Sequence, residues 1–324
     1  MGQPHAPRHG SVQFWPRKRA KHSVARLRSW APESKVKPLG FVGYKAGMTH
    51  LQIKDNHPRS LTKGEEVMLA STIIECPPMT VAGVCFYKRG LLGLQKTGCV
   101  WAESLSKHLA KRIQLPKKPT SKKFSDFTDF DEVKLLVHSN PYLIAPLNVK
   151  RPKLIELAVG GSNKDKLAYA QQVLGKEIKV EDVFDEGNSL DVHGITIGKG
   201  FQGTVKRFGV MIRQHKAEKT KRGIGTLGPW HPNRVRYSVP QPGKMGFHLR
   251  TDYNKQLLKI GKTGTEVTPA GGLNKYGVVK NTYVLIRGSV MGSKKRAVMM
   301  TRSIRPNTKM TKDAPQILHV SLRS

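Results

Sequence analysis

The sequence has few acidic residues for its length. Its 324 residues include 22 Asp and Glu against 57 Lys and Arg, so the formal net charge is +35. A compact body with this charge repels itself and attracts any polyanion. We therefore expect a nucleic-acid partner, with an anionic membrane surface as the weaker alternative.

Long hydrophobic runs and secretion signals are also lacking. No apolar run approaches the roughly 20 residues that a membrane-spanning helix needs. The first residues contain neither the apolar core of a signal peptide nor the Ser or Thr of a myristoylation signal. We expect a cytoplasmic protein that does not enter a membrane.

Cysteine is scarce, and known catalytic motifs are missing. The three cysteines form no CxxC pair, which argues against a disulfide framework or a zinc knuckle. The 12 histidines include no HExxH, and no GxSxG turn occurs. The sequence predicts no metal, no cofactor, no small-molecule substrate and no enzymatic activity.

The few acids are concentrated in one stretch. Residues 126–191 hold 12 of the 22 acids and only eight Lys and Arg, so this stretch has a net charge of −4 and the rest of the chain +39. Such asymmetry indicates a nearly neutral module within a strongly basic frame.

The periodicity predicts a mainly β protein, a β-barrel divided by an α/β insertion. A helix is expected at 103–114, and a second one begins after Ser162 and ends at Gly175. The predicted strands are 67–74, 81–87, 135–137, 154–157, 190–197, 282–290, 296–302 and 318–322.

We expect six segments along the chain. They are a basic N-terminal arm (1–37), the first part of the barrel (38–100), the α/β insertion (101–178), a continuation of the barrel (179–212), a basic finger (213–250) and the completion of the barrel (251–324).

The arm and the finger combine positive charge with tryptophan. Trp15 and Trp30 alternate with cations in the arm, which suits stacking on bases. The finger has too few apolar residues for a core of its own, since ordering each residue costs about 1–2 kcal/mol. Trp230 lies in its middle between two prolines, and base stacking is worth about 1–3 kcal/mol per base. A core position for Trp230 remains the alternative.

The segment Gly198–Gly203 reads as GxGxxG, the pattern of a dinucleotide-binding turn. That function requires a following helix, and the β-branched residues after Gly203 argue against one. We interpret the glycines as a turn that lets the backbone approach RNA. Two rival hypotheses remain open, a cofactor-dependent nucleic-acid-modifying enzyme and a chromatin-like DNA-binding protein.

A longer pattern around these glycines resembles the signature of the family of ribosomal protein three of the large subunit. Further similarity covers Gly40–Thr49 and the segment from Gly246 to Gly261, and the finger resembles the archaeal and eukaryotic branch. The matching signature positions are Phe184, Asp191, Gly194, Thr196, Gly198, Lys199, Gly200, Gly203 and Arg207.

The resemblance implies a translation-protein-type β-barrel, an embedded α/β region and long, irregular basic extensions. It further implies a primary ribosomal RNA-binding protein that binds near the 3′ end of the large-subunit RNA, nucleates assembly and extends a finger toward the peptidyl transferase centre. Expected neighbours are the large-subunit proteins fourteen and twenty-four-e. Some relatives carry a methylated histidine where Glu218 stands here, so this modification is not expected.

The charge pattern, the aromatic residues and the resemblance together select a set of candidate RNA-binding residues. These are Arg8, Trp15, Arg17, Lys18, Arg19, Lys21, Arg26, Arg28, Lys199, Arg207, Arg213, Lys216, Lys219, Lys221, Arg222, Trp230, His231, Arg234, Arg236, Lys244, His248 and Arg250.

Overall fold

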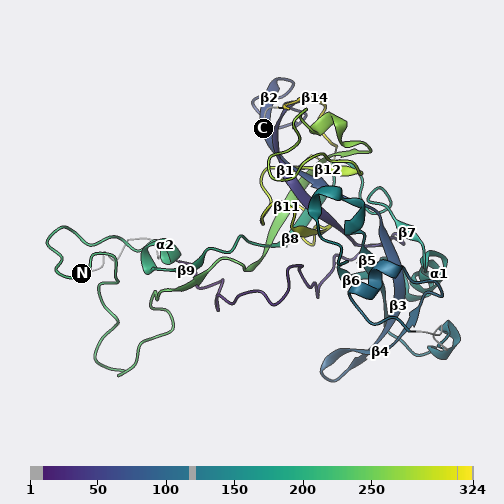
Figure 1. The fold of residues 1–324 in the computed structure, drawn as a ribbon, viewed down its shortest axis with the longest axis horizontal. Coiled ribbons are helices and arrows are strands. Elements are labelled where there is room, and N and C mark those ends of the chain that lie inside the picture. The colour runs from purple at the N-terminus through teal and green to yellow at the C-terminus, as the bar shows by residue number, and fades with distance from the viewer. Residues whose placement is uncertain (1–9, 117–121, 312, 323–324) are drawn as a thin grey trace. The chain divides into compact units, whose positions relative to one another are not determined.

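A computed structural model describes residues 10–116, 122–311 and 313–322 of the chain (Figure 1). The candidate Arg8 lies outside these residues. The chain divides into two compact units. The smaller, which we call the basic unit, comprises residues 1–22 and 195–250, and the larger, the β unit, comprises 23–194 and 251–324. No helix within the described part of the chain has the length and apolar character to cross a bilayer.

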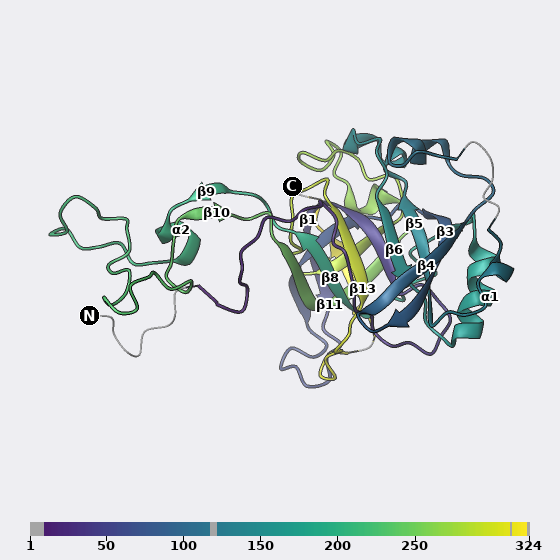
Figure 2. The same ribbon diagram turned by 90° about the horizontal axis from the view of Figure 1, so that it is seen from below.

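The first sheet of the β unit contains seven strands in the order β13-β8-β11-β12-β2-β1-β14. Their bounds are β1 (Gly40–Lys54), β2 (Glu66–Glu75), β8 (Ser189–Ile195), β11 (Leu249–Gly261), β12 (Tyr283–Arg287), β13 (Ala297–Arg302) and β14 (Ile317–Val320). Strand β13 pairs with β1 as well as with β8, from Gly40 opposite Thr301 to Tyr44 opposite Ala297. This pairing joins the two ends of the strand order, apart from β14, into a ring. Figure 2 shows β8 beside β13 and β11.

The second sheet has the order β4-β3-β5-β6, with β7 also paired to β3. Its strands are β3 (Met79–Gly90), β4 (Gly93–Trp101), β5 (Glu132–Ser139), β6 (Leu154–Ala158) and β7 (Glu177–Ile178). We expected residues 79–100 to belong to the same barrel segment as β1 and β2. That assignment was wrong, because β3 and β4 pair with each other and β3 with β5.

The helix α1 (Asn163–Val173) forms as the sequence predicts. The Ser162 side chain accepts a hydrogen bond from the backbone N–H of Asp165, and Gly175 follows the helix with a positive φ of 79°. α1 packs against β5 with Ala170 fully buried. The predicted helix at 103–114 was wrong, since only a short 3-10 turn, η1 (Lys107–Lys111), forms there. Leu109 alone is buried in that turn, and a single anchored residue does not stabilise three helical turns.

Both sheets contribute to one hydrophobic core. Phe41 and Leu285 from the first sheet and Leu135 and Leu157 from the second are fully buried in the same cluster. The Tyr44 hydroxyl and the Ser139 hydroxyl lie 2.8 Å apart and link β1 to β5, and burial raises the pKa of Tyr44 to about 12. The core is therefore continuous across the two sheets.

Trp30 belongs to this core and not to an RNA-facing arm. Its side chain packs against the buried cluster, and a Cβ on Gly40 would come within 3.0 Å of its ring. Ala25 and Ala31 are also buried. The expected arm of residues 1–37 thus divides at residue 22, and Trp30 was wrongly assigned to base stacking.

The basic unit contains little regular structure. β9 (Gly200–Gln202) pairs with β10 (Gly243–Met245), and α2 (Thr204–Phe208) lies between β9 and the finger. Residues 209–242, all of which are described, form neither helix nor strand. α2 corrects the expectation that no helix follows Gly203. It has only five residues, and β9 pairs antiparallel, so the parallel βαβ arrangement of a dinucleotide site does not form here.

Candidate nucleic-acid interface

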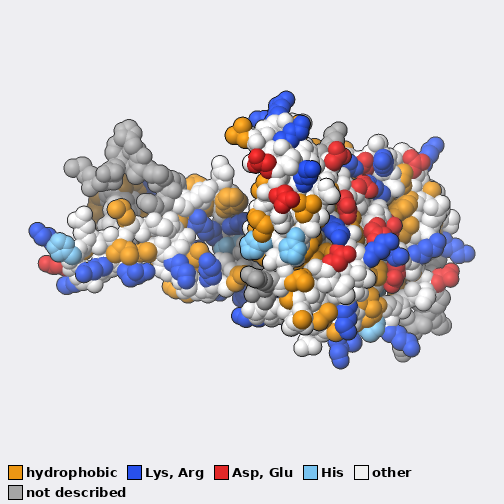
Figure 3. Space-filling view, turned by 90° about the horizontal axis from the view of Figure 1, so that it is seen from above, with side chains coloured by type: hydrophobic (Ala, Val, Ile, Leu, Met, Phe, Trp, Pro, Cys, Tyr) orange, Lys and Arg blue, Asp and Glu red, His pale blue; other side chains and the backbone are white. Residues whose placement is uncertain are grey.

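The basic unit has an extreme charge composition. Its two segments hold 17 Lys and Arg and a single acid, Glu218, among 78 residues. On the face visible in Figure 3, blue cationic side chains of this unit lie beside orange apolar ones. With one acid to neutralise 17 cations, the unit requires counter-ions or a polyanion.

A cluster of aromatic side chains holds the arm and the finger of this unit together. The Trp15 ring lies 6.0 Å from Phe208 of α2 and 5.7 Å, edge-on, from Tyr237 of the finger. The Arg17 guanidinium lies over the Phe208 ring at 4.1 Å. Half-buried in this cluster, Trp15 stabilises the unit itself and is poorly placed to stack on a base along its whole face.

Several candidate residues make hydrogen bonds within the chain. Arg207 donates to the carbonyls of Gln241, at 2.7 Å, and Lys244, at 3.2 Å. Arg213 donates to the carbonyl of Ile224. The Arg207 contacts hold the C-terminal part of the finger against α2, and the Arg213 contact joins the start of the finger to its own middle, so we assign the two arginines a positioning role.

His248 is buried, contrary to the surface position expected of an RNA ligand. Its Nδ1 lies 2.7 Å from the carbonyl of Lys18, and its backbone N–H donates to the Thr196 hydroxyl at 3.1 Å. The neighbouring Ala20 N–H donates to the carbonyl of Phe247 at 2.8 Å. His248 therefore attaches the N-terminal arm to the finger base, and Lys18 is exposed beside it.

The remaining candidates differ in how exposed their side chains are and in the compact unit to which they belong. Arg250 is half-buried with its guanidinium 4.8 Å from the Phe14 ring centre, and burial lowers its pKa. Arg26 and Arg28 are exposed but belong to the β unit. The other candidates are exposed in the basic unit, namely Lys18, Arg19, Lys21, Lys199, Lys216, Lys219, Lys221, Arg222, Trp230, His231, Arg234, Arg236 and Lys244.

Three exposed aromatic rings stand out among these cations. Trp230 is 77% exposed, Tyr237 74% and Phe201 72%. The position of Trp230 agrees with the expectation that it is not a core residue. Our sequence reasoning missed Tyr237 and Phe201, although the signal that selected Trp230, an aromatic side chain among cations and glycines, applies to both. Together they offer faces on which unpaired bases can stack.

The described residues contain no group of three or more His, Cys, Asp and Glu close enough to hold a metal ion. The exposed cations and aromatic rings of the basic unit can neutralise phosphates and stack on bases.

Comparison of the sequence with known proteins gives matches over nearly the whole chain. The family model described as "Ribosomal protein L3" matches residues 1–321. The "Large ribosomal subunit protein uL3" of Archaeoglobus fulgidus is 47% identical over 325 residues, covering 99% of this chain and 98% of that protein. Proteins of the same description from Methanothrix thermoacetophila and Methanocaldococcus jannaschii are both 44% identical, over 331 and 326 residues, and the matches cover 97% or more of each chain.

Proposed function

The chain belongs to the ribosomal protein L3 family, whose members are structural and non-enzymatic, and on that premise we propose that it is an RNA-binding constituent of the large ribosomal subunit. The observation that carries this proposal is the basic unit, with 17 cations, one acid and three aromatic rings that are more than 70% exposed. Phosphate contacts would supply most of the affinity. A-form grooves hide base edges, so stacking would act on unpaired bases.

The finer assignments rest on the resemblance described above. The protein would bind near the 3′ end of the large-subunit RNA, nucleate assembly and direct the finger toward the peptidyl transferase centre. Its neighbours would be the large-subunit proteins fourteen and twenty-four-e. The ring of strands in the β unit supports a translation-protein-type barrel, and the second sheet with α1 supports an embedded α/β region.

Co-sedimentation tests the proposed function. The full chain is expected to sediment with large ribosomal subunits and to be released only by high salt, because phosphate contacts weaken steeply as salt rises. Ribosomal RNA should displace the chain from labelled RNA at a much lower concentration than duplex DNA does. Equal competition by duplex DNA would instead favour the chromatin-like hypothesis.

Replacing Trp230 by Ala separates stacking from folding. We expect the melting temperature to change by no more than about 1 °C, because an exposed side chain leaves no cavity. The affinity for large-subunit RNA should fall by roughly fivefold to 100-fold, because stacking on one base contributes about 1–3 kcal/mol of binding free energy. Calorimetry and filter binding measure the two effects. Trp30→Ala is the matched control, which should lower the melting temperature strongly, and a similar loss for Trp230→Ala would make Trp230 a core residue.

A further inference from the structure

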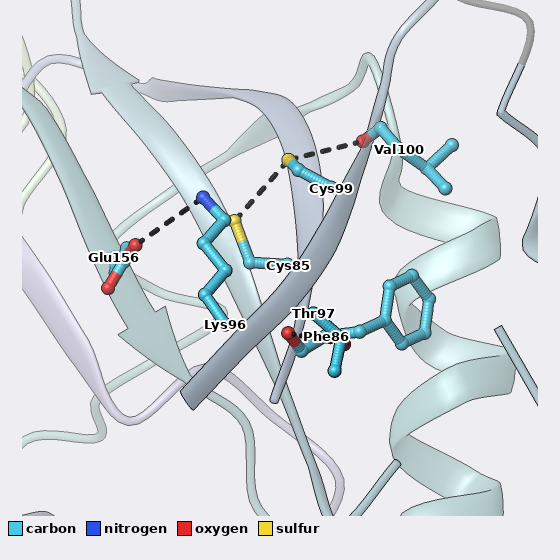
Figure 4. A network of polar contacts seen from close by, with 7 residues as sticks. All are labelled: Cys85, Phe86, Lys96, Thr97, Cys99, Val100 and Glu156. Atoms are coloured by element: carbon cyan, nitrogen blue, oxygen red, sulfur yellow. Dashed lines mark hydrogen bonds and ion pairs between the residues drawn. The ribbon is translucent and has the colours of Figure 1, made fainter. Parts of the chain in front are cut away.

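Two of the three cysteines face each other across the edge of the second sheet. In the antiparallel pair of β3 and β4, Cys85 is directly opposite Cys99, and their sulfur atoms are 3.3 Å apart (Figure 4). β4 is the edge strand in the order of this sheet. Cys76 is a separate, buried free thiol near the end of β2.

This pair lies outside the main core. Cys85 belongs to a small cluster with Tyr87 and Leu136, against which Cys99 and Trp101 pack. Cys85 is fully buried in that cluster, whereas Cys99 is only half-buried. Cys99 is therefore the side from which a small oxidant would approach the pair, while Cys85 is sheltered beside it.

The surroundings favour one negative charge on the pair. The contact with Cys99 lowers the pKa of Cys85 against the opposing effect of burial, and the Lys96 ammonium lowers it further. The same contact raises the pKa of Cys99. Lys96 in turn lies 3.9 Å from Glu156 of β6. These shifts favour the thiolate, which is the reactive form, on Cys85 rather than on Cys99.

We propose that Cys85 and Cys99 form a modification site, at which a peroxide converts the two thiols into a cross-strand disulfide that a dithiol reductant reverses. A disulfide requires a sulfur–sulfur bond of about 2.05 Å, so the sulfur atoms must approach by roughly 1.2 Å. The edge position of β4 permits this movement, because β4 is held by a neighbouring strand on one side alone. The bond would close the β3–β4 hairpin covalently.

The reaction balances in two steps. The Cys99 thiol gives its proton to the Cys85 thiolate as the Cys99 sulfur attacks one peroxide oxygen, the S–O bond forms, the O–O bond breaks, and the second oxygen leaves as hydroxide. Cys85 then attacks the Cys99 sulfur, the S–S bond forms, the S–O bond breaks, and the hydroxyl leaves as water with the Cys85 proton. Two thiols are oxidised, and one peroxide is reduced.

Thiol counting on the full chain tests this site. The reduced protein is treated with hydrogen peroxide, denatured in a maleimide and digested. We expect the labelled cysteines to fall from three to one, with a mass loss of about 2 Da before labelling and a cross-linked peptide pair containing Cys85 and Cys99. Dithiothreitol should restore three labelled cysteines. Three labelled cysteines after peroxide, or a cross-link that involves Cys76 or a second chain, overturns the proposal.

Variants test the Cys99 sulfur and the Lys96 charge separately. Cys99→Ser, at a half-buried position that tolerates a hydroxyl, should abolish the cross-link while the folded state, checked by circular dichroism, persists. Lys96→Gln should slow disulfide formation several-fold with the same end point, because less thiolate is present. Lys88→Gln is the matched control, since this exposed lysine of the same hairpin pairs with Asp129. An equal rate in the Lys96 and Lys88 variants would contradict the role of Lys96.

Discussion

Replacing Arg234, Arg236 and Lys244 together by Gln is expected to flatten the salt dependence of RNA binding. All three side chains are exposed in the basic unit, where Glu218 is the sole acid. Each phosphate contact to a single strand contributes about −0.7 to the slope of log affinity against log salt. Loss of three contacts should therefore reduce the slope by about 2, and the affinity near 0.1 M salt by at least an order of magnitude.

Filter binding of the full chain to large-subunit RNA, from low to moderate salt, measures the slope. The matched control replaces Lys164, Lys176 and Lys179 by Gln, which removes the same charge from exposed positions in the acidic stretch of the β unit. That control should leave the slope unchanged. A flattened slope in both variants would mean that net charge matters and the finger has no special role. An unchanged slope in both would remove the finger from the interface.

The fold class could be predicted because side-chain periodicity is local information. β2, β3, β5 and β6 lie where β-branched or alternating residues predicted strands, and the Ser162 cap and Gly175 marked the ends of α1. The partners of each strand could not be predicted in this way. Whether β3 pairs with β2 in the ring or with β5 in the second sheet depends on register across long sequence separations, which no local pattern contains.

The candidate interface was predictable in composition but not in detail. A segment rich in cations and poor in apolar residues identified residues 213–250 as a finger. The same criterion cannot distinguish a cation that is free to bind RNA from one that makes hydrogen bonds within the chain. Arg207 binds the carbonyl of Gln241, 34 residues away in the sequence, and His248 lies beside the carbonyl of Lys18, 230 residues away. Such roles depend on tertiary proximity alone.

Replacing Glu75 by Ala is expected to lower the free energy of unfolding by several kcal/mol. The Glu75 side chain is fully buried at the end of β2. One carboxylate oxygen accepts the Tyr276 hydroxyl at 2.6 Å. The other accepts the backbone N–H groups of Lys280 and Asn281, at 3.2 and 3.0 Å, and the Asn281 amide at 2.7 Å. This single carboxylate therefore anchors the segment that precedes β12.

Ala at position 75 would remove the acceptor of four donors, of which one, the Asn281 amide, has a second acceptor, the carbonyl of Leu143 at 3.1 Å. Each buried, unsatisfied donor costs about 1–3 kcal/mol, although water entering the cavity would compensate for part of this. We expect the free energy of unfolding to fall by about 3–5 kcal/mol, the summed cost of several donors that lose their acceptor, less the part that water recovers. For a unit of this size the melting temperature should fall on the order of 10 °C.

Calorimetry of graded variants distinguishes this network from simple loss of volume. Glu75→Gln keeps the shape and one acceptor oxygen, so it should lose clearly less stability than Glu75→Ala. Tyr276→Phe removes one donor and its hydroxyl, and should cost roughly 1 kcal/mol. Glu65→Ala, at an exposed position just before the same strand, is the control and should have almost no effect. A loss below 1 kcal/mol for Glu75→Ala would show that the carboxylate network contributes little. Because Glu75 lies in the β unit, whereas Arg234, Arg236 and Lys244 lie in the basic unit, the folded variant should retain the salt slope of RNA binding even as its melting temperature falls.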